Sequence, residues 1–239
     1  MKPQRHFHDE LEQLEGRLIR MAGLAEESVR LAVDALAEHD FQRAEAVLQR
    51  DREIDDLEIE VDDAAIHLLA LQQPMARDLR FIAMAMKISN DLERVGDHAV
   101  NIAQNVIYLL QLPPIRVLPE IGEMVRIVGG MLQDAFGSFI RSDSRLAREV
   151  CARDDRVDEL HDNVFRILLT HMMEDPRRIG AGMDLILISR NLERIADLAT
   201  NIAEDVVFLV EGRNIKHQVG RRHADGDLSG LGRPGAPHG

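Results

Sequence analysis

The amino-acid sequence predicts an all-α fold built from two tandem three-helix bundles, six helices in all, related by internal pseudo-symmetry. Apolar residues recur every three or four positions over long stretches, which is the period of an amphipathic helix. Aromatic residues make up only 3% of the 239 residues and Trp is absent, so the core must consist of Leu, Ile, Val, Ala and Met, which favours helix packing. The second half of the chain also repeats the motifs of the first.

The first bundle is predicted from three long periodic segments. The first runs from His8 to Glu38, and Asp40 is expected to cap a second segment that reaches about Leu71, where "QQP" interrupts the pattern. The third runs from Met75 to Leu110 and ends at the proline-rich "LPPIRVLP". These breaks predict three helices joined by short connections.

The second bundle is predicted in the same way. A fourth helix is expected from about Glu120 to Ile140, and Ser142 and Asp143 are expected to cap a fifth that reaches about Met173. The sixth begins at "EDP" and ends near "VEGRN", where Gly212 is expected to stop the helix.

Two motifs fix the internal repeat. "RDREIDDL" at 50–57 matches "RDDRVDEL" at 153–160, which is 103 residues later, and "SNDLERVGDHAVNIAQNV" at 89–106 matches "SRNLERIADLATNIAEDV" at 189–206, which is 100 residues later. The predicted organisation is a first bundle at 1–112, a second at 113–212 and a disordered tail at 213–239, which is rich in Gly, Pro and His.

Composition excludes several classes of protein. The net charge of −13 argues against a nucleic-acid binder, which needs a basic surface, and suits the binding of cations or of a basic partner. Cys151 is the single cysteine, so no disulfide framework exists and a reducing cytoplasm is expected. The N-terminus does not resemble a signal peptide, and no apolar run reaches the roughly 18 residues that span a bilayer.

Acidic residues form a stripe on each helix of the long repeated motif. Glu93, Asp97 and Asn101 recur every four residues, nearly opposite an apolar stripe, and the sixth helix repeats the pattern with Glu193, Asp197 and Asn201. Like charges at this spacing repel each other unless something compensates for them. Both copies nevertheless keep the three residues while neighbouring positions differ, so the acids are predicted to have a role.

The second and fifth helices carry further acids beside their apolar arcs. At 100° per residue, Asp51 and Glu58 fall within the arc of the second helix and Asp55 at its edge, while the fifth helix has Asp154, Asp158 and His161 at the equivalent places. A buried carboxylate needs a partner or must take up a proton. Salt bridges from Arg50, Arg52, Arg94, Arg153 and Arg194 could supply it, and so could a divalent metal ion held mainly by oxygen ligands.

These motifs, together with "ARDLRFIAMAMKISNDLERVGDHAVNIA" at 76–103, resemble the PhoU family of bacterial phosphate-signalling and phosphate-transport regulators over residues 8–212. The resemblance implies two three-helix bundles in a homodimer that binds iron, zinc, manganese or magnesium through E(D)-x-x-x-D motifs. One site would use Asp51, Asp55, Glu93, Asp97 and Asn101, and the other Asp154, Asp158, Glu193, Asp197 and Asn201. Glu58 and His161 are further candidates.

The resemblance also implies a non-enzymatic role. Members of this family link the ATPase of the phosphate ABC transporter (PstB) to the sensor histidine kinase PhoR, restrain phosphate uptake and keep the phosphate regulon inactive. The protein would then be cytoplasmic and would meet the membrane only through these complexes.

Two alternatives stay open. The helices could form a partner-docking module whose acids never bind metal. The chain could also be a carboxylate-bridged di-iron enzyme, although such enzymes carry Glu-x-x-His on two helices and only Asp158-x-x-His161 is found here.

Overall fold

The computed structural model describes residues 2–72, 74–113 and 116–212, and every regular element in these ranges is helical. The elements, in chain order, are α1 (Lys2–Glu38), α2 (Phe41–Gln72), α3 (Ala76–Leu109), α4 (Pro119–Arg141), α5 (Ser144–Cys151), α6 (Asp154–Glu174), the single 3₁₀ turn η1 (Pro176–Arg178) and α7 (Ile179–Glu211). The predicted all-α fold of two three-helix units is therefore confirmed. The tail predicted at 213–239 lies outside the described residues.

The fifth predicted helix differs from the prediction because it is broken between α5 and α6. At the break, the Arg153 amide donates a hydrogen bond to the Val150 carbonyl, which closes a tighter turn than an α-helix does. The Arg153 side chain forms an ion pair with Asp134 of α4, with 2.6 Å between Nη2 and Oδ2. Asp154 and Asp155 then occupy the first turn of α6, where negative charge stabilises a new helix N-terminus.

Most of the predicted helix ends are confirmed. The Asp40 carboxylate accepts hydrogen bonds from the amides of Gln42 and Arg43, and Gly212 ends α7 in the left-handed conformation with φ 68°. Asp143 caps α5, but Ser142 does not take part as predicted. Ser142 instead ends α4 in the left-handed region with φ 50°.

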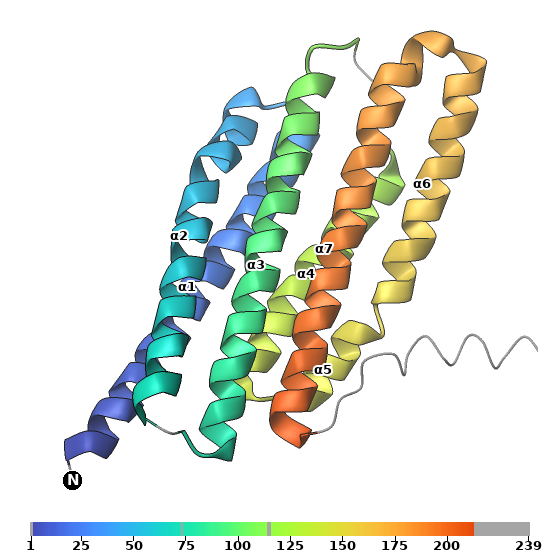
Figure 1. The fold of residues 1–239 in the computed structure, drawn as a ribbon. Coiled ribbons are helices and arrows are strands. Elements are labelled where there is room, and N and C mark those ends of the chain that lie inside the picture. The colour runs from blue at the N-terminus through green and yellow to red at the C-terminus, as the bar shows by residue number, and fades with distance from the viewer. Residues whose placement is uncertain (1, 73, 114–115, 213–239) are drawn as a thin grey trace, which may run out of the picture.

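The helices form two layers (Figure 1). α2, α3, α7 and α6 lie side by side in the front of the view, and α1 and α4 lie behind them. The equivalent helices α3 and α7 run antiparallel along the centre, where Lys87 Nζ lies 3.4 Å from Asp205 Oδ1 and His98 Nδ1 is hydrogen bonded to Asn191 Oδ1 at 2.9 Å. The buried residues of both repeats form one continuous apolar core.

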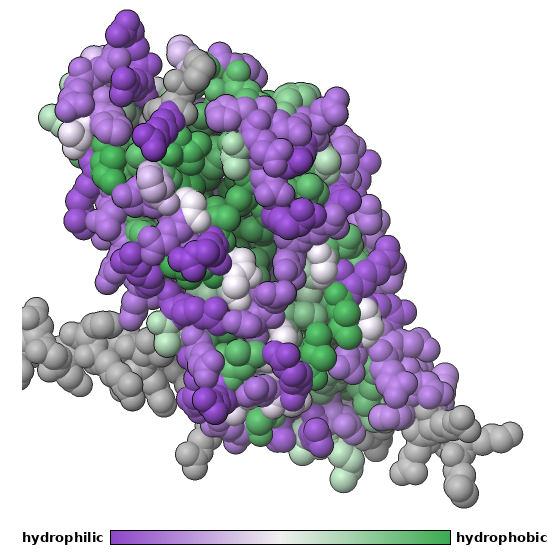
Figure 2. Space-filling model, turned by 180° about the vertical axis from the view of Figure 1, so that it is seen from behind, coloured by the Kyte–Doolittle hydropathy of each residue, from purple (hydrophilic) through white to green (hydrophobic). Residues whose placement is uncertain are grey.

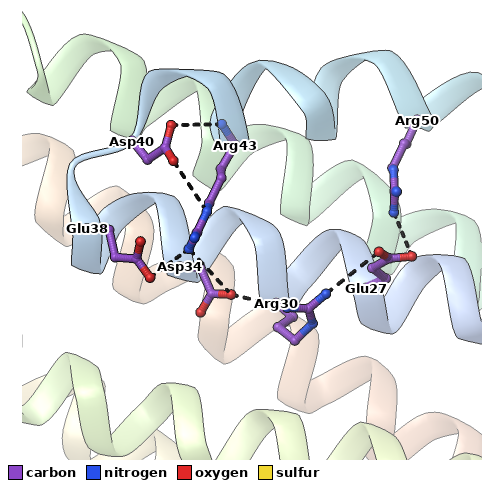
Figure 3. Close-up of polar contacts among 7 residues, drawn as sticks. All are labelled: Glu27, Arg30, Asp34, Glu38, Asp40, Arg43 and Arg50. Carbon is purple, nitrogen blue, oxygen red and sulfur yellow. Dashed lines mark hydrogen bonds and ion pairs between the residues drawn. The ribbon is translucent and has the colours of Figure 1, made fainter.

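Ion pairs join the two helices of the first hairpin, α1 and α2 (Figure 3). Arg50 of α2 reaches Glu27 of α1 at 2.6 Å, and Arg43 reaches Glu38 at 2.7 Å near the turn. Such partly exposed pairs contribute about 0.2–1 kcal/mol each. They therefore add little to the stability of the fold.

The face opposite to that of Figure 1 is largely hydrophilic, and apolar surface shows between the hydrophilic side chains, most of all in the upper half (Figure 2). None of the helices in the described ranges is long and apolar enough to cross a bilayer.

Candidate metal centres

The acids of the first repeat are brought together by a close approach of α2 and α3. This contact occurs at Gly96, where a Cβ atom would lie 3.0 Å from Ile54 Cδ1 and 3.9 Å from Asp51 Oδ1. Because the glycine has no side chain, the two helices can approach closely enough for Asp51 and Asp55 of α2 to lie beside Glu93 and Asp97 of α3. These four carboxylates are called cluster 1.

The electrostatics of cluster 1 show that its carboxylates interact. Burial and, after it, the charges of Asp97, Glu58, Asp55 and Asp51 together raise the pKa of Glu93 to about 7. Burial also raises the pKa of Asp51, with a contribution from Asp55 and Asp97. The pKa of Asp55 is raised in the same way by burial and by Asp97. Repulsion among these groups therefore opposes their simultaneous ionisation.

The second repeat forms an equivalent cluster 2 from Asp154 and Asp158 of α6 and Glu193 and Asp197 of α7. Burial raises the pKa of Asp154 to about 7, helped by the charges of Asp158 and Asp197. The pKa values of Asp158 and Glu193 are also raised, first by burial and then by Asp197. The same pattern of mutually repelling carboxylates thus occurs once in each repeat, with Asp97 and Asp158 exposed and the other six half-buried.

The two clusters differ in their basic partners. Arg194 pairs with Asp197 at 2.9 Å and with Glu193 at 3.4 Å, so salt bridges partly neutralise cluster 2. Its first-repeat counterpart, Arg94, pairs with Asp91 at 3.7 Å instead. Within the described ranges, no Lys or Arg lies within 4.0 Å of the carboxylates of cluster 1. The salt-bridge alternative therefore applies to cluster 2 and not to cluster 1.

Two further predicted residues, Glu58 and His161, lie beside the clusters but have other partners. Glu58 accepts a hydrogen bond from Asn90 of α3 at 3.3 Å, and His161 Nδ1 lies 3.0 Å from Ser189 Oγ of α7. Burial lowers the pKa of His161, which favours the neutral ring. Both residues thus tie the α2–α3 and α6–α7 pairs together at equivalent places.

The two predicted asparagines are placed differently. Asn201 lines a pocket of about 420 Å³ together with Asp197, Arg194 and Arg94, so it lies beside cluster 2. Asn101 is exposed one turn beyond Asp97, and no contact of its side chain with cluster 1 is found. The structure therefore groups Asn201 with its cluster but does not group Asn101.

Thr200 is a residue of this site that the sequence did not reveal. Its buried Oγ1 and the buried Oδ1 of Asp154 both lack a hydrogen-bond partner. The Thr200 hydroxyl is close enough to limit the rise of the pKa of Asp154, although the two groups are not in hydrogen-bond geometry. Thr200 lies seven residues after Glu193, on the same side of α7. The comparison of repeats concealed it because the first-repeat counterpart is Val100.

The donor set suits a hard or borderline cation. In the part of the chain that the structure describes, no three His, Cys, Asp or Glu side chains lie close enough together to hold a metal ion as they stand. Each cluster nevertheless offers four carboxylates from two adjacent helices, and cluster 2 has an unpartnered buried oxygen on Asp154. A divalent cation would compensate for the repulsion that raises these pKa values.

Comparison with known proteins gives a consistent result. The model of the PhoU domain matches the chain twice, over residues 18–106 and 121–206. The phosphate-specific transport system accessory protein PhoU homolog of Caulobacter vibrioides is 41% identical over 213 residues, which covers 89% of this chain and 93% of the relative. That of Aquifex aeolicus is 43% identical over 209 residues, covering 87% and 95% of the two chains.

Two solved structures share the fold. The crystal structure of PhoU from Pseudomonas aeruginosa has a TM-score of 0.84 and 40% identity, covering 87% of this chain and 100% of its own. The phosphate transport system regulatory protein PhoU from Streptococcus pneumoniae has a TM-score of 0.81 and 29% identity, covering 88% and 99%.

Proposed function

The chain belongs to the PhoU family, and from this premise we propose that it is an accessory and regulatory protein of a phosphate-specific transport system. Its similarity to proteins of that name extends over both repeats and over nearly their whole length. The role is regulatory and not catalytic. In support, His161, which the di-iron alternative would need as a ligand, is hydrogen bonded to Ser189.

The proposed regulatory protein binds divalent or transition metal ions, among them iron, zinc, manganese or magnesium, at cluster 1 and cluster 2. The observation that carries this part is the presence of a four-carboxylate cluster in each repeat, with the pKa of one member raised to about 7. Asp51, Asp55, Glu93 and Asp97 would hold one ion, and Asp154, Asp158, Glu193 and Asp197 the other. The cation would supply positive charge, and the carboxylates would supply oxygen ligands and orientation.

The proposed partners are the transporter ATPase PstB and the sensor kinase PhoR. The protein would act as a homodimer in the cytoplasm, restrain phosphate uptake and keep the phosphate regulon inactive. Its acidic surface, with a net charge of −13, supports docking on basic partner surfaces. It would approach the membrane only through the transporter complex.

Metal content is the first test. Protein purified without chelator is expected to contain bound divalent metal by elemental analysis, and added metal is expected to raise the melting temperature of the stripped protein. Glu93→Ala with Asp97→Ala should lose the metal of cluster 1. Glu53→Ala with Asp63→Ala is the matched control, because both of these α2 carboxylates are exposed and lie outside the cluster. If the purified protein contains no metal and added cations do not change its melting temperature, the metal proposal is wrong and the acids can serve only as a docking surface.

The regulatory role needs a separate test. Deletion of the gene is expected to raise phosphate uptake and expression of phosphate-starvation genes in phosphate-rich cells, and the wild-type chain should reverse both effects. Co-purification of PstB and PhoR should be compared with and without chelator. Binding that persists in chelator and weakens in salt would favour the metal-free docking module.

A further inference from the structure

A pocket of about 420 Å³ lies where the connection between α3 and α4 meets the turn between α6 and α7, at the upper end of the molecule in Figure 1. Its charged lining residues are Arg116 of the connection and Asp175, Arg177 and Arg178 of the turn. Three arginines accompany one aspartate, so the lining has a net charge of +2 in a chain whose net charge is −13. The pocket therefore favours an anion, in contrast to the two carboxylate clusters.

Asp175 holds two of the arginines in place and leaves most of their donors free. Its carboxylate accepts two hydrogen bonds from Arg177, with Nε 3.0 Å from Oδ1 and Nη2 3.3 Å from Oδ2, and its Oδ2 lies 3.5 Å from Arg178 Nε. Each guanidinium has five N–H groups, so Asp175 occupies only a minority of the donors of these two side chains. Within the described ranges, Arg116 forms no ion pair with an Asp or Glu. The pocket thus offers positioned donors that lack an acceptor.

Packing of the connection against α7 brings the arginines together. A Cβ at Gly180 would lie 3.4 Å from Leu112 Cδ1, so the connection contacts the first turn of α7 directly. Ala181 also lines the pocket, and the positive end of the α7 dipole lies at this turn. The Arg177 amide donates a hydrogen bond of 3.2 Å to Asp175, which holds the turn in shape. Two segments that are far apart in the sequence therefore present their arginines to one pocket.

The first repeat has a pocket at the equivalent place, but its charge is different. Arg77 lines that pocket, 100 residues before Arg177. Two arginines meet three carboxylates there, which gives a net charge of −1 when His8 is neutral: Arg77, Arg80, Glu12, Glu15 and Asp78. The bundle thus forms this pocket in both repeats, and the excess of arginine is found in the second.

We propose that the pocket of Arg116, Arg177 and Arg178 binds inorganic phosphate. The hydrogen phosphate dianion carries the charge that balances the pocket, and its oxygens suit the planar donor set of a guanidinium group. A carboxylate ligand has a single charge and would leave the pocket positive. Ala181 lies 16 residues before Asp197 on α7, about 24 Å along the helix, so the pocket is separate from cluster 2. The proposal rests on the pocket itself and does not depend on bound metal.

Equilibrium dialysis of the full-length chain against radiolabelled inorganic phosphate tests the proposal. Chloride holds the ionic strength constant, and chelator is present throughout to remove metal ions. The wild-type chain is expected to bind phosphate saturably under these conditions. Absence of saturable binding would overturn the proposal.

Matched variants locate the site. Arg177→Gln and Arg116→Gln should each weaken phosphate binding about tenfold, because each removes a charge-assisted hydrogen bond. Arg77→Gln, at the equivalent position of the first repeat, should leave the affinity unchanged. Circular dichroism checks that the three variants fold. Equal loss of affinity in Arg77→Gln and Arg177→Gln would show attraction by overall charge and would overturn the assignment.

Two further measurements separate other sources of phosphate binding. Phosphate that binds only without chelator, and as tightly to Arg116→Gln as to the wild type, would lie on metal ions at the clusters and would contradict the proposal. Vesicles of phosphatidylglycerol present the phosphate group as a monoanion, and the wild-type chain is expected not to sediment with them. Sedimentation with vesicles that is lost in Arg116→Gln, without binding of free phosphate, would assign the pocket to lipid headgroups instead.

Discussion

Gly96 of α3 and Ile54 of α2 fill one shared space in the first repeat, and a Cβ at position 96 would approach Ile54 Cδ1 to 3.0 Å. The second repeat solves the same packing problem in the opposite way, because the equivalent residues are Ala196 and Val157, both fully buried. Compared with the first repeat, the second has one more side-chain carbon on α7 (Ala196 for Gly96) and one fewer on α6 (Val157 for Ile54).

This exchange predicts strong coupling between the two positions. Gly96→Ala should gain about 1 kcal/mol of helix propensity and lose much of it to crowding against Ile54, while Ile54→Val alone should cost about 0.5–1.5 kcal/mol. The double variant should be more stable than the sum of the single effects by at least about 0.5 kcal/mol. Chemical denaturation of the four proteins measures this difference. If the two single-variant changes in stability simply add, α2 and α3 relieve the crowding by shifting apart, and the two positions are not coupled.

The raised pKa values predict that the metal-free protein becomes less stable as the pH rises. Glu93 and Asp154 have folded-state pKa values of about 7, above their unfolded values, so the folded chain holds more protons. Their stabilisation is complete below about pH 4 and is lost as the pH passes 7. Allowing for screening at these partly exposed groups, the loss is about 1 kcal/mol each, or about 2–4 °C in Tm.

Thermal denaturation in chelator between pH 5 and 8 measures this loss. Glu93→Gln and Asp154→Asn should flatten the profile, whereas Glu53→Gln, on an exposed acid of α2, should leave it unchanged. A profile that rises from pH 5 to 8 would contradict the assignment.

The different basic partners of the clusters predict unequal metal affinity. Arg194 occupies Glu193 and Asp197, so cluster 2 should bind a divalent cation more weakly than cluster 1. Arg194→Gln should strengthen binding at cluster 2 roughly tenfold, because it removes about 1.4 kcal/mol of competing charge interaction. Arg145→Gln is the matched control, since exposed Arg145 pairs with Glu149 and with neither cluster. Calorimetric titration resolves the two sites, and equal affinities in the wild type would contradict this account.

Two helix ends are held in the left-handed conformation by residues other than glycine, His39 with φ 56° and Ser142 with φ 50°. Left-handed backbone costs most residues about 1–2 kcal/mol, of which part is offset by the greater freedom of glycine when unfolded. Ser142→Gly and His39→Gly should each stabilise the protein by about 0.5 kcal/mol. Gly212→Ala should destabilise it, and the opposite signs together test the conformational cause.

Helix positions and the repeat could be predicted from the sequence because apolar period, caps and duplicated motifs are all local signals. Asp40 and Asp143 cap as predicted for that reason. The break before Asp154 could not be predicted, because it depends on the pairing of Arg153 with Asp134 on another helix. The pattern predicts Ser142 at a helix start because serine is common at N-caps, whereas the left-handed end of a helix that it occupies is usually glycine or asparagine.

The carboxylates of the site could be predicted from their repetition, but their partners could not. Arg94 and Arg194 occupy equivalent positions in the repeated motif, but Arg94 pairs with Asp91 and Arg194 pairs with Asp197. Thr200 was missed because it has no counterpart in the first repeat. Residues that both repeats share can be recognised by comparing the two halves of the sequence. A residue that is important in one repeat only can be recognised from the three-dimensional structure.

The contact of α3 with α7 joins the two halves of the chain through one shared apolar core. A fragment ending near Leu112 would expose to water the side of α3 that faces α7, and the complementary fragment would expose the matching side of α7. Each piece is therefore expected to be less stable alone than within the intact chain. The core that the two repeats share is therefore expected to make unfolding of the whole chain one cooperative event.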